Sequence, residues 1–101
     1  MSHRVLPNLP SVLPAHLSQD ERAARLVARV GWTAAQAQVA LAGIDGQTCV
    51  EIAAHLGIAD GTVRAHQRDA AAWIGVHTRE AVTARVVATL WQSVVEDIGG
   101  R

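Results

Sequence analysis

The sequence predicts an all-α fold, a helix-turn-helix bundle of about five helices preceded by an extended, proline-rich N-terminal arm. Two observations support this prediction. In three places a Ser or Thr stands three residues before a Glu or Gln, which is the capping-box spacing that satisfies the free N–H groups at a helix start. The helical patterns that follow also end at glycine, the residue that most readily adopts the left-handed conformation at a helix C-terminus. No segment shows the alternation typical of a strand hairpin.

The composition limits the size and class of the protein. A chain of 101 residues, 50% hydrophobic and 18% charged, can bury one modest core, so we expect a single globular unit. No apolar run approaches the length of a membrane span and no signal peptide is recognisable, so we expect a cytoplasmic protein without a membrane partner. The formal net charge is +0, which argues against strong nonspecific binding to polyanions.

The first segment, residues 1–17, predicts an extended arm because prolines fix φ and lack a backbone N–H. These prolines are Pro7, Pro10 and Pro14,. No acidic residue precedes Asp20, so the arm is basic. Contact between the arm and DNA phosphates or a minor groove is one expectation, and an unstructured terminus is the alternative.

The remaining residues, 18–101, are expected to form one helical domain. Ser18 opens a first helix over residues 19–30, which Gly31 ends,. Thr33 opens a second helix, which the following "DG" pair ends.

A third helix is expected from Thr48 to the glycine at position 57,. The fourth is expected over residues 60–74, with a glycine directly after it,. The fifth, over residues 79–98, begins with Thr78 as its cap,.

The break "GIA" between the third and fourth helices turns the chain sharply, which is typical of a helix-turn-helix,. If the apolar residues of the fourth helix face inward, Arg64, Ala65 and Arg68 lie on its outer face near the N-terminus. An arginine fork can donate two hydrogen bonds to guanine O6 and N7, and a small alanine allows close approach and contact with a thymine methyl. The spacing therefore predicts that the fourth helix reads a DNA major groove.

Residues 32–76 contain the run "EIAAHLGIADGTVRAH", and "EAV" follows at residues 80–82. With these motifs the chain resembles the DNA-binding domain of LuxR-type (GerE-like) transcriptional regulators over residues 32–82. The resemblance implies a four-helix domain whose third helix reads DNA and whose fourth often dimerises. The positions it implies for DNA contact are Arg64, Ala65 and Arg68 at the bases, and Gln47, Thr48, Thr62 and His66 near the DNA backbone.

The chain also departs from the family pattern. Ala59 stands where members commonly have a serine, so the fourth helix lacks its usual cap unless Asp60 replaces it,. Between residues 47 and 79 three arginines balance three carboxylates, which makes the reading surface electrostatically weak. Because no receiver or ligand-sensing sequence precedes the motif, we expect a stand-alone regulator such as a small bacterial or phage protein.

Other kinds of chemistry fit the sequence less well. Cys49 and the histidines that follow it match no zinc-ligand spacing, so no metal or cofactor is expected,. No nucleophile is paired with a base by spacing, so the protein is not expected to be an enzyme. The three tryptophans are expected to lie in the core or in an interface,.

The last helix is apolar over about half of its circumference, more than one core contact requires. The residues expected to remain for a homodimer interface are Leu90, Trp91, Val94, Val95 and Ile98. The alternative is that the first helix covers this face within the same chain. Pairing two weakly charged DNA-reading surfaces would raise the effective affinity for double-stranded DNA.

The predicted function is therefore sequence-specific transcription regulation by a dimer on double-stranded DNA. The alternative is a protein-interaction module that antagonises a host regulator through the last helix. RNA polymerase is a further candidate partner.

Overall fold

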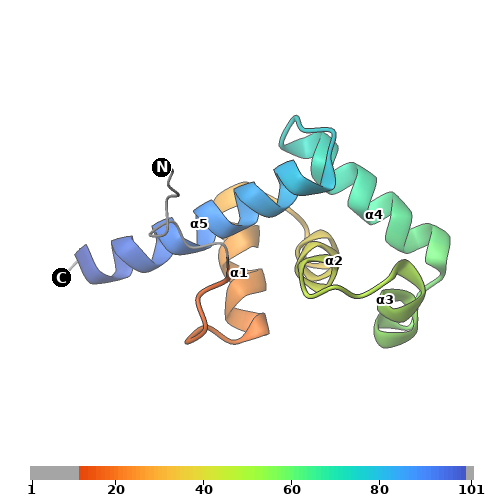
Figure 1. The fold of residues 1–101 in the computed structure, drawn as a ribbon, viewed down its shortest axis with the longest axis horizontal. Coiled ribbons are helices and arrows are strands. Elements are labelled where there is room, and N and C mark those ends of the chain that lie inside the picture. The colour runs from red at the N-terminus through yellow and green to blue at the C-terminus, as the bar shows by residue number, and fades with distance from the viewer. Residues whose placement is uncertain (1–11, 100–101) are drawn as a thin grey trace, which may run out of the picture.

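The computed structural model describes residues 12–99 as five helices, with no strand among these residues (Figure 1). The helices are α1 (Gln19–Val30), α2 (Ala34–Ile44), α3 (Cys49–Leu56), α4 (Asp60–Trp73) and α5 (Arg79–Gly99). The all-α prediction is confirmed, and every helix ends within one residue of its predicted bounds. No helix in the described part of the chain has both the length and the apolar character to cross a membrane.

The helix starts follow from local hydrogen bonding. At α1 the Ser18 hydroxyl accepts from the Glu21 N–H at 3.1 Å, and the Glu21 carboxylate accepts from the Ser18 N–H at 2.8 Å. The boxes at Thr33 and Thr48 repeat this arrangement for α2 and α3. At α4 the cap position is held by Ala59, and no side chain bonds the first turn. One of the four helices of the family pattern therefore begins without a side-chain cap.

Two clusters of buried side chains hold the helices together. The larger joins α1, α2, α4 and α5 and consists of Leu13, Leu26, Trp32, Ala37, Leu41, Ala70, Val86 and Leu90. The smaller fixes α3 between α2 and α4 and consists of Val39, Ile52, Ala53 and Val63. Within the larger cluster the Trp32 indole N–H donates to the Ala70 carbonyl at 3.0 Å, which satisfies a buried donor and links the start of α2 to α4,.

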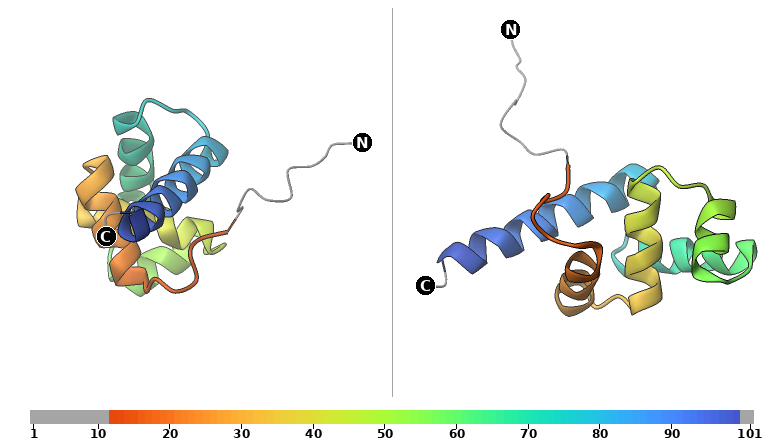
Figure 2. Two further views of the ribbon diagram at one scale, coloured as in Figure 1. Left: turned by 90° about the vertical axis from the view of Figure 1, so that its left-hand side faces the viewer. Right: turned by 90° about the horizontal axis from the view of Figure 1, so that it is seen from below.

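The described part of the predicted arm, residues 12–17, packs against the helices. Leu13 and Leu17 are buried, and the Trp91 indole N–H donates to the Val12 carbonyl at 2.7 Å. Figure 2 shows this segment crossing α5 before it enters α1. The rest of the predicted arm lies outside the described residues. The prolines predicted an extended segment. The structure shows in addition that Leu13 and Leu17 pack this segment against the core.

Helix α1 covers part of the face of α5 that the sequence assigned to a dimer. Leu90 is fully buried in the same cluster as Leu26 of α1, and Val94 is also buried. Contact with a second subunit through these two α5 residues is therefore not available. Val95 and Ile98, in contrast, are 58% and 70% exposed near the end of α5, which extends beyond the other helices (Figure 1).

Candidate nucleic-acid interface

Helices α3 and α4 meet at a sharp turn that is set by one glycine and a small apolar core. Gly57 has φ of +70°, the left-handed conformation that ends a helix,. The N–H of Ile58 then donates to the Ala53 carbonyl at 3.0 Å and closes the last turn of α3. Ile52 of α3 and Val63 of α4 are both fully buried. Apolar packing thus fixes the orientation of α4 across α3, although no side chain caps α4.

The far end of α4 is anchored by an indole. The Trp73 N–H donates to the Val30 carbonyl at the end of α1, at 2.8 Å, while the side chain stays 65% exposed. A Cβ at Gly31 would lie 3.2 Å from the Trp73 nitrogen, so a glycine at this position leaves room for the ring. The C-terminal turn of α4 is therefore fastened to α1 as well as to α2.

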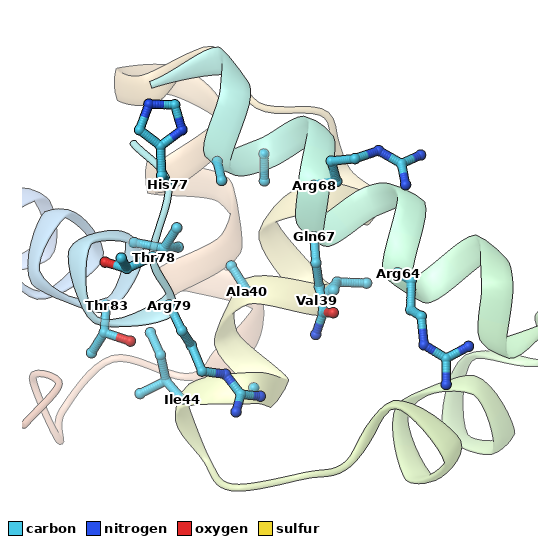
Figure 3. Close-up of a pocket in the computed structure, with 14 residues that line it drawn as sticks. Val39, Ala40, Ile44, Arg64, Gln67, Arg68, His77, Thr78, Arg79 and Thr83 are labelled. Carbon is cyan, nitrogen blue, oxygen red and sulfur yellow. The ribbon is translucent and has the colours of Figure 1, made fainter. Parts of the chain in front are cut away.

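Arg64 and Arg68 are exposed on α4, one turn apart, as the sequence predicted. Neither forms an ion pair within residues 12–99. Figure 3 shows them on one side of a groove, with Arg79 and His77, near the start of α5, on the other side. The sequence reasoning missed His77 and Arg79 as site residues. The available signal was their position directly after the predicted DNA-reading helix, His77 in the short connection and Arg79 at the first position of α5.

The other predicted residues of α4 occupy neighbouring strips of the same helix. Ala65 is half-buried, Thr62 is exposed and His66 is half-buried. At 100° per residue Thr62 and His66 fall together on the flank of α4 away from Arg64, with Ala65 between the two flanks. A ligand lying along the outer face of α4 would therefore meet an arginine strip, the small Ala65 and a polar strip that also carries the exposed Asp69,.

Gln47 and Thr48 precede α3. The Thr48 hydroxyl accepts from the Glu51 N–H at 3.2 Å, and this cap leaves the hydroxyl proton free for a further acceptor. Gln47 is half-buried and lines a smaller depression of about 230 Å³ between α1, α2 and α3, beside Asp45 and His55. The structure does not bring Gln47 into the groove that the arginines border.

The net charge counted along residues 47–79 differs from the net charge of the side chains that line the groove. The groove beside Arg64 is lined by arginines and a histidine and by no carboxylate. The three acidic residues that offset the arginines in sequence are all outside its lining. The lining of the groove therefore carries positive charge although the chain has a formal net charge of +0.

No metal centre emerges from the described residues. Within them no group of three or more His, Cys, Asp or Glu side chains gathers closely enough to hold an ion. Cys49 is half-buried, and its thiol lies 3.5 Å from the Gln67 side-chain oxygen.

A family model for bacterial regulatory proteins of the luxR family matches residues 32–86, more than half of the chain. The chain belongs to the luxR family of bacterial regulatory proteins. The match spans α2, α3, α4 and the first part of α5, and so includes the turn and both arginines of α4. It confirms the resemblance drawn from the sequence and indicates a DNA-binding domain of transcription regulators. Comparisons with curated proteins and with solved structures returned no match.

Proposed function

We propose that this luxR-family protein is a sequence-specific transcriptional regulator that inserts α4 into the major groove of double-stranded DNA. The observation that carries the proposal is the pair Arg64 and Arg68, exposed on the second helix of the helix-turn-helix without carboxylate partners among the described residues. Each guanidinium can donate two parallel hydrogen bonds to guanine O6 and N7. Ala65 between them lets the helix approach the base edges closely.

Contacts with the DNA backbone complete this proposal. Thr62 and His66 face one side of the inserted helix, and His77 with Arg79 faces the other. Thr48, with Gln47 before it, stands at the start of α3, whose exposed N–H groups and positive dipole end favour a phosphate. These contacts would position α4 without carrying sequence information, because phosphates are the same at every base pair.

Selection from a pool of random DNA duplexes tests the proposal, because no operator sequence is needed. A recurring motif containing guanines is expected, and fluorescence anisotropy should show tighter binding to it than to a scrambled duplex of equal composition. Failure of any motif to enrich, or equal affinity for both duplexes, would contradict sequence-specific binding.

The protein is further proposed to act as a homodimer through the exposed end of α5. Val95 and Ile98 are exposed there, with the partly buried Trp91 one turn before Val95. Two DNA-reading domains on adjacent half-sites would bind more tightly than one. Sedimentation should show a dimer that Val95→Glu with Ile98→Glu dissociates. A parent protein that stays monomeric at high micromolar concentration, with and without DNA, would refute the dimer.

The competing proposal is an interaction module that antagonises a host regulator, or contacts RNA polymerase, through α5. The family match does not favour it, because the matched residues centre on the helix-turn-helix. The duplex selection separates the two proposals, because only the first requires the protein itself to bind DNA.

A further inference from the structure

The groove beside the arginines has an apolar floor. It lies between α2, α4 and the start of α5, is open to solvent on one side and has a volume of about 410 Å³ (Figure 3). Its floor and walls include Val39, Ala40, Gly43, Ile44, Ala71 and Val82. This volume falls within the range of roughly 300–1,000 Å³ that small-molecule sites occupy. Contacts with DNA phosphates would use its charged edge and leave the apolar floor unused.

Gly43 keeps this floor open. Gly43 is the next-to-last residue of α2, and the glycines with positive φ in the described chain are at other positions. A Cβ built at Gly43 would meet no atom within 4 Å. Neither backbone conformation nor a close contact therefore requires glycine in α2. Its effect is to leave space in the groove that a larger side chain would fill.

The edge of the groove is cationic on two sides. Arg64 and Arg68 border it from α4, and Arg79 borders it from the start of α5. The ion pairs in the described chain belong to Arg25 and Arg29 of α1. Guanidinium groups bind carboxylate-like anions through paired, charge-assisted hydrogen bonds. An apolar floor beneath unpaired arginines is complementary to a small molecule with an apolar body and one anionic group.

We propose that this groove binds a small organic anion of the carboxylate or sulfonate class, and that the bound anion competes with DNA for Arg64 and Arg68. The ligand would neutralise the arginines that the proposed function assigns to the bases, so its binding lowers DNA affinity. The competition rests on the proposed function, whereas the ligand site does not.

Anilinonaphthalene sulfonate and its uncharged counterpart N-phenylnaphthylamine form a matched pair of probes, because they share the aromatic body and differ in the anionic group. Titration followed by amide chemical-shift mapping should place the sulfonate against α2, α4 and the start of α5. The uncharged probe should bind more weakly. Gly43→Leu should weaken sulfonate binding at least about tenfold by filling the floor, whereas Gly43→Ala should weaken it much less.

Several results would overturn the proposal. Shifts confined to Val95 and Ile98, or unchanged binding to Gly43→Leu, would show that the groove takes no organic anion. Equal binding of both probes would show that the arginines do not recognise the anionic group. Displacement of the sulfonate by inorganic phosphate at equal concentration would assign the arginines to phosphate alone. Circular dichroism of both Gly43 variants controls for folding.

DNA titrations separate this proposal from the proposed function. Gly43→Leu should bind the selected duplex like the parent but lose its sensitivity to the sulfonate. If neither the parent nor any variant binds DNA, the proposed function is refuted and the probe site is unaffected. If the protein binds DNA and the sulfonate never reduces that binding, the competition is refuted.

Discussion

Helices α1 and α4 are similar in length, at 12 and 14 residues, yet they use their arginines in opposite ways. Arg22 of α1 donates to the Pro14 carbonyl at 2.8 Å, and the other two arginines of α1 are paired with carboxylates of α5. Arg64 and Arg68 of α4 have no such partner in the described chain. The cations of α1 stabilise the fold, and those of α4 are available to a ligand.

The starts of the two helices differ in the same direction. The α1 helix begins with a capping box at Ser18. The α4 helix begins at Ala59 without a side-chain cap. If α4 reads DNA as proposed, stability and recognition depend on different arginine-bearing helices, so substitutions of these arginines should affect one property at a time.

The largest expected effect is on DNA affinity. Arg64→Ala and Arg68→Ala should each cost about 1–3 kcal/mol in binding to the selected duplex, because each loses a paired contact with a base. The thermal midpoint should not change, since both side chains are exposed and unpaired within residues 12–99. Arg85→Ala, an exposed arginine of α5, is the matched control. If both α4 variants bind the duplex like the parent, the assignment of α4 to DNA reading fails.

Arg25→Ala should show the opposite pattern. The Arg25 guanidinium lies 2.6 Å from the Asp97 carboxylate and donates to the Ser93 hydroxyl at 3.0 Å, with its side chain 25% exposed. Losing both contacts should reduce the free energy of unfolding by about 1–2 kcal/mol, measured by urea denaturation. DNA affinity of the folded protein should be unchanged, and a comparable loss of affinity would contradict the division of roles.

Supplying the missing cap should stabilise α4. Ala59→Ser places a hydroxyl where it can accept from the free N–H groups of the first turn, and should raise the free energy of unfolding by about 1 kcal/mol. Ala72→Ser, at an exposed position inside α4, is the control and should be neutral or slightly destabilising. Equal effects of the two substitutions would show that the first turn gains nothing from a cap.

The smallest effect concerns pH. The hydrogen bond from the Arg29 side chain lowers the pKa of Glu96 below its usual value of 4.5. The folded state therefore binds fewer protons than the unfolded state near this pH. The stabilising contribution is present above pH 4.5 and is lost as the pH falls through the lower folded pKa,.

Urea denaturation across this acidic range measures the effect. Glu96→Gln should flatten the dependence of stability on pH, and Glu80→Gln, at the other end of α5 and outside the ion pairs of the described chain, should leave it unchanged. The dependence should be slight because the Glu96 side chain is 50% exposed,. A dependence that survives Glu96→Gln unchanged would assign it to other carboxylates.

Local signals predicted the helices and the turn because caps, glycines and apolar periodicity act over a few residues. The structure confirms Thr48 and Gly57 at the two ends of α3 for this reason. Burial of Leu13 could not be predicted, since proline spacing fixes an extended backbone but not the surface against which it packs. Coverage of Leu90 by α1 was left open by the sequence, because either a helix or a second subunit could fill the same apolar face.

The groove and its charge could not be predicted from the sequence for a related reason. Gly43 of α2 and Arg79 at the start of α5 lie far apart along the chain and meet only after α2, α4 and α5 have packed. Counting charges along the sequence therefore predicted a DNA-reading surface with little net charge. The fold, in contrast, places the carboxylates outside the groove lining.

The indole of Trp73 fastens the last turn of α4 to α1, while the first turn has no side-chain cap. Amide hydrogens of α4 should therefore exchange with solvent at rates that rise from the anchored end towards Thr62. If α4 binds DNA as proposed, a helix ordered in this graded manner would lose conformational entropy in its first turn on binding. That loss would reduce the affinity, but it would allow the turn that precedes Arg64 to adjust to the shape of the DNA groove.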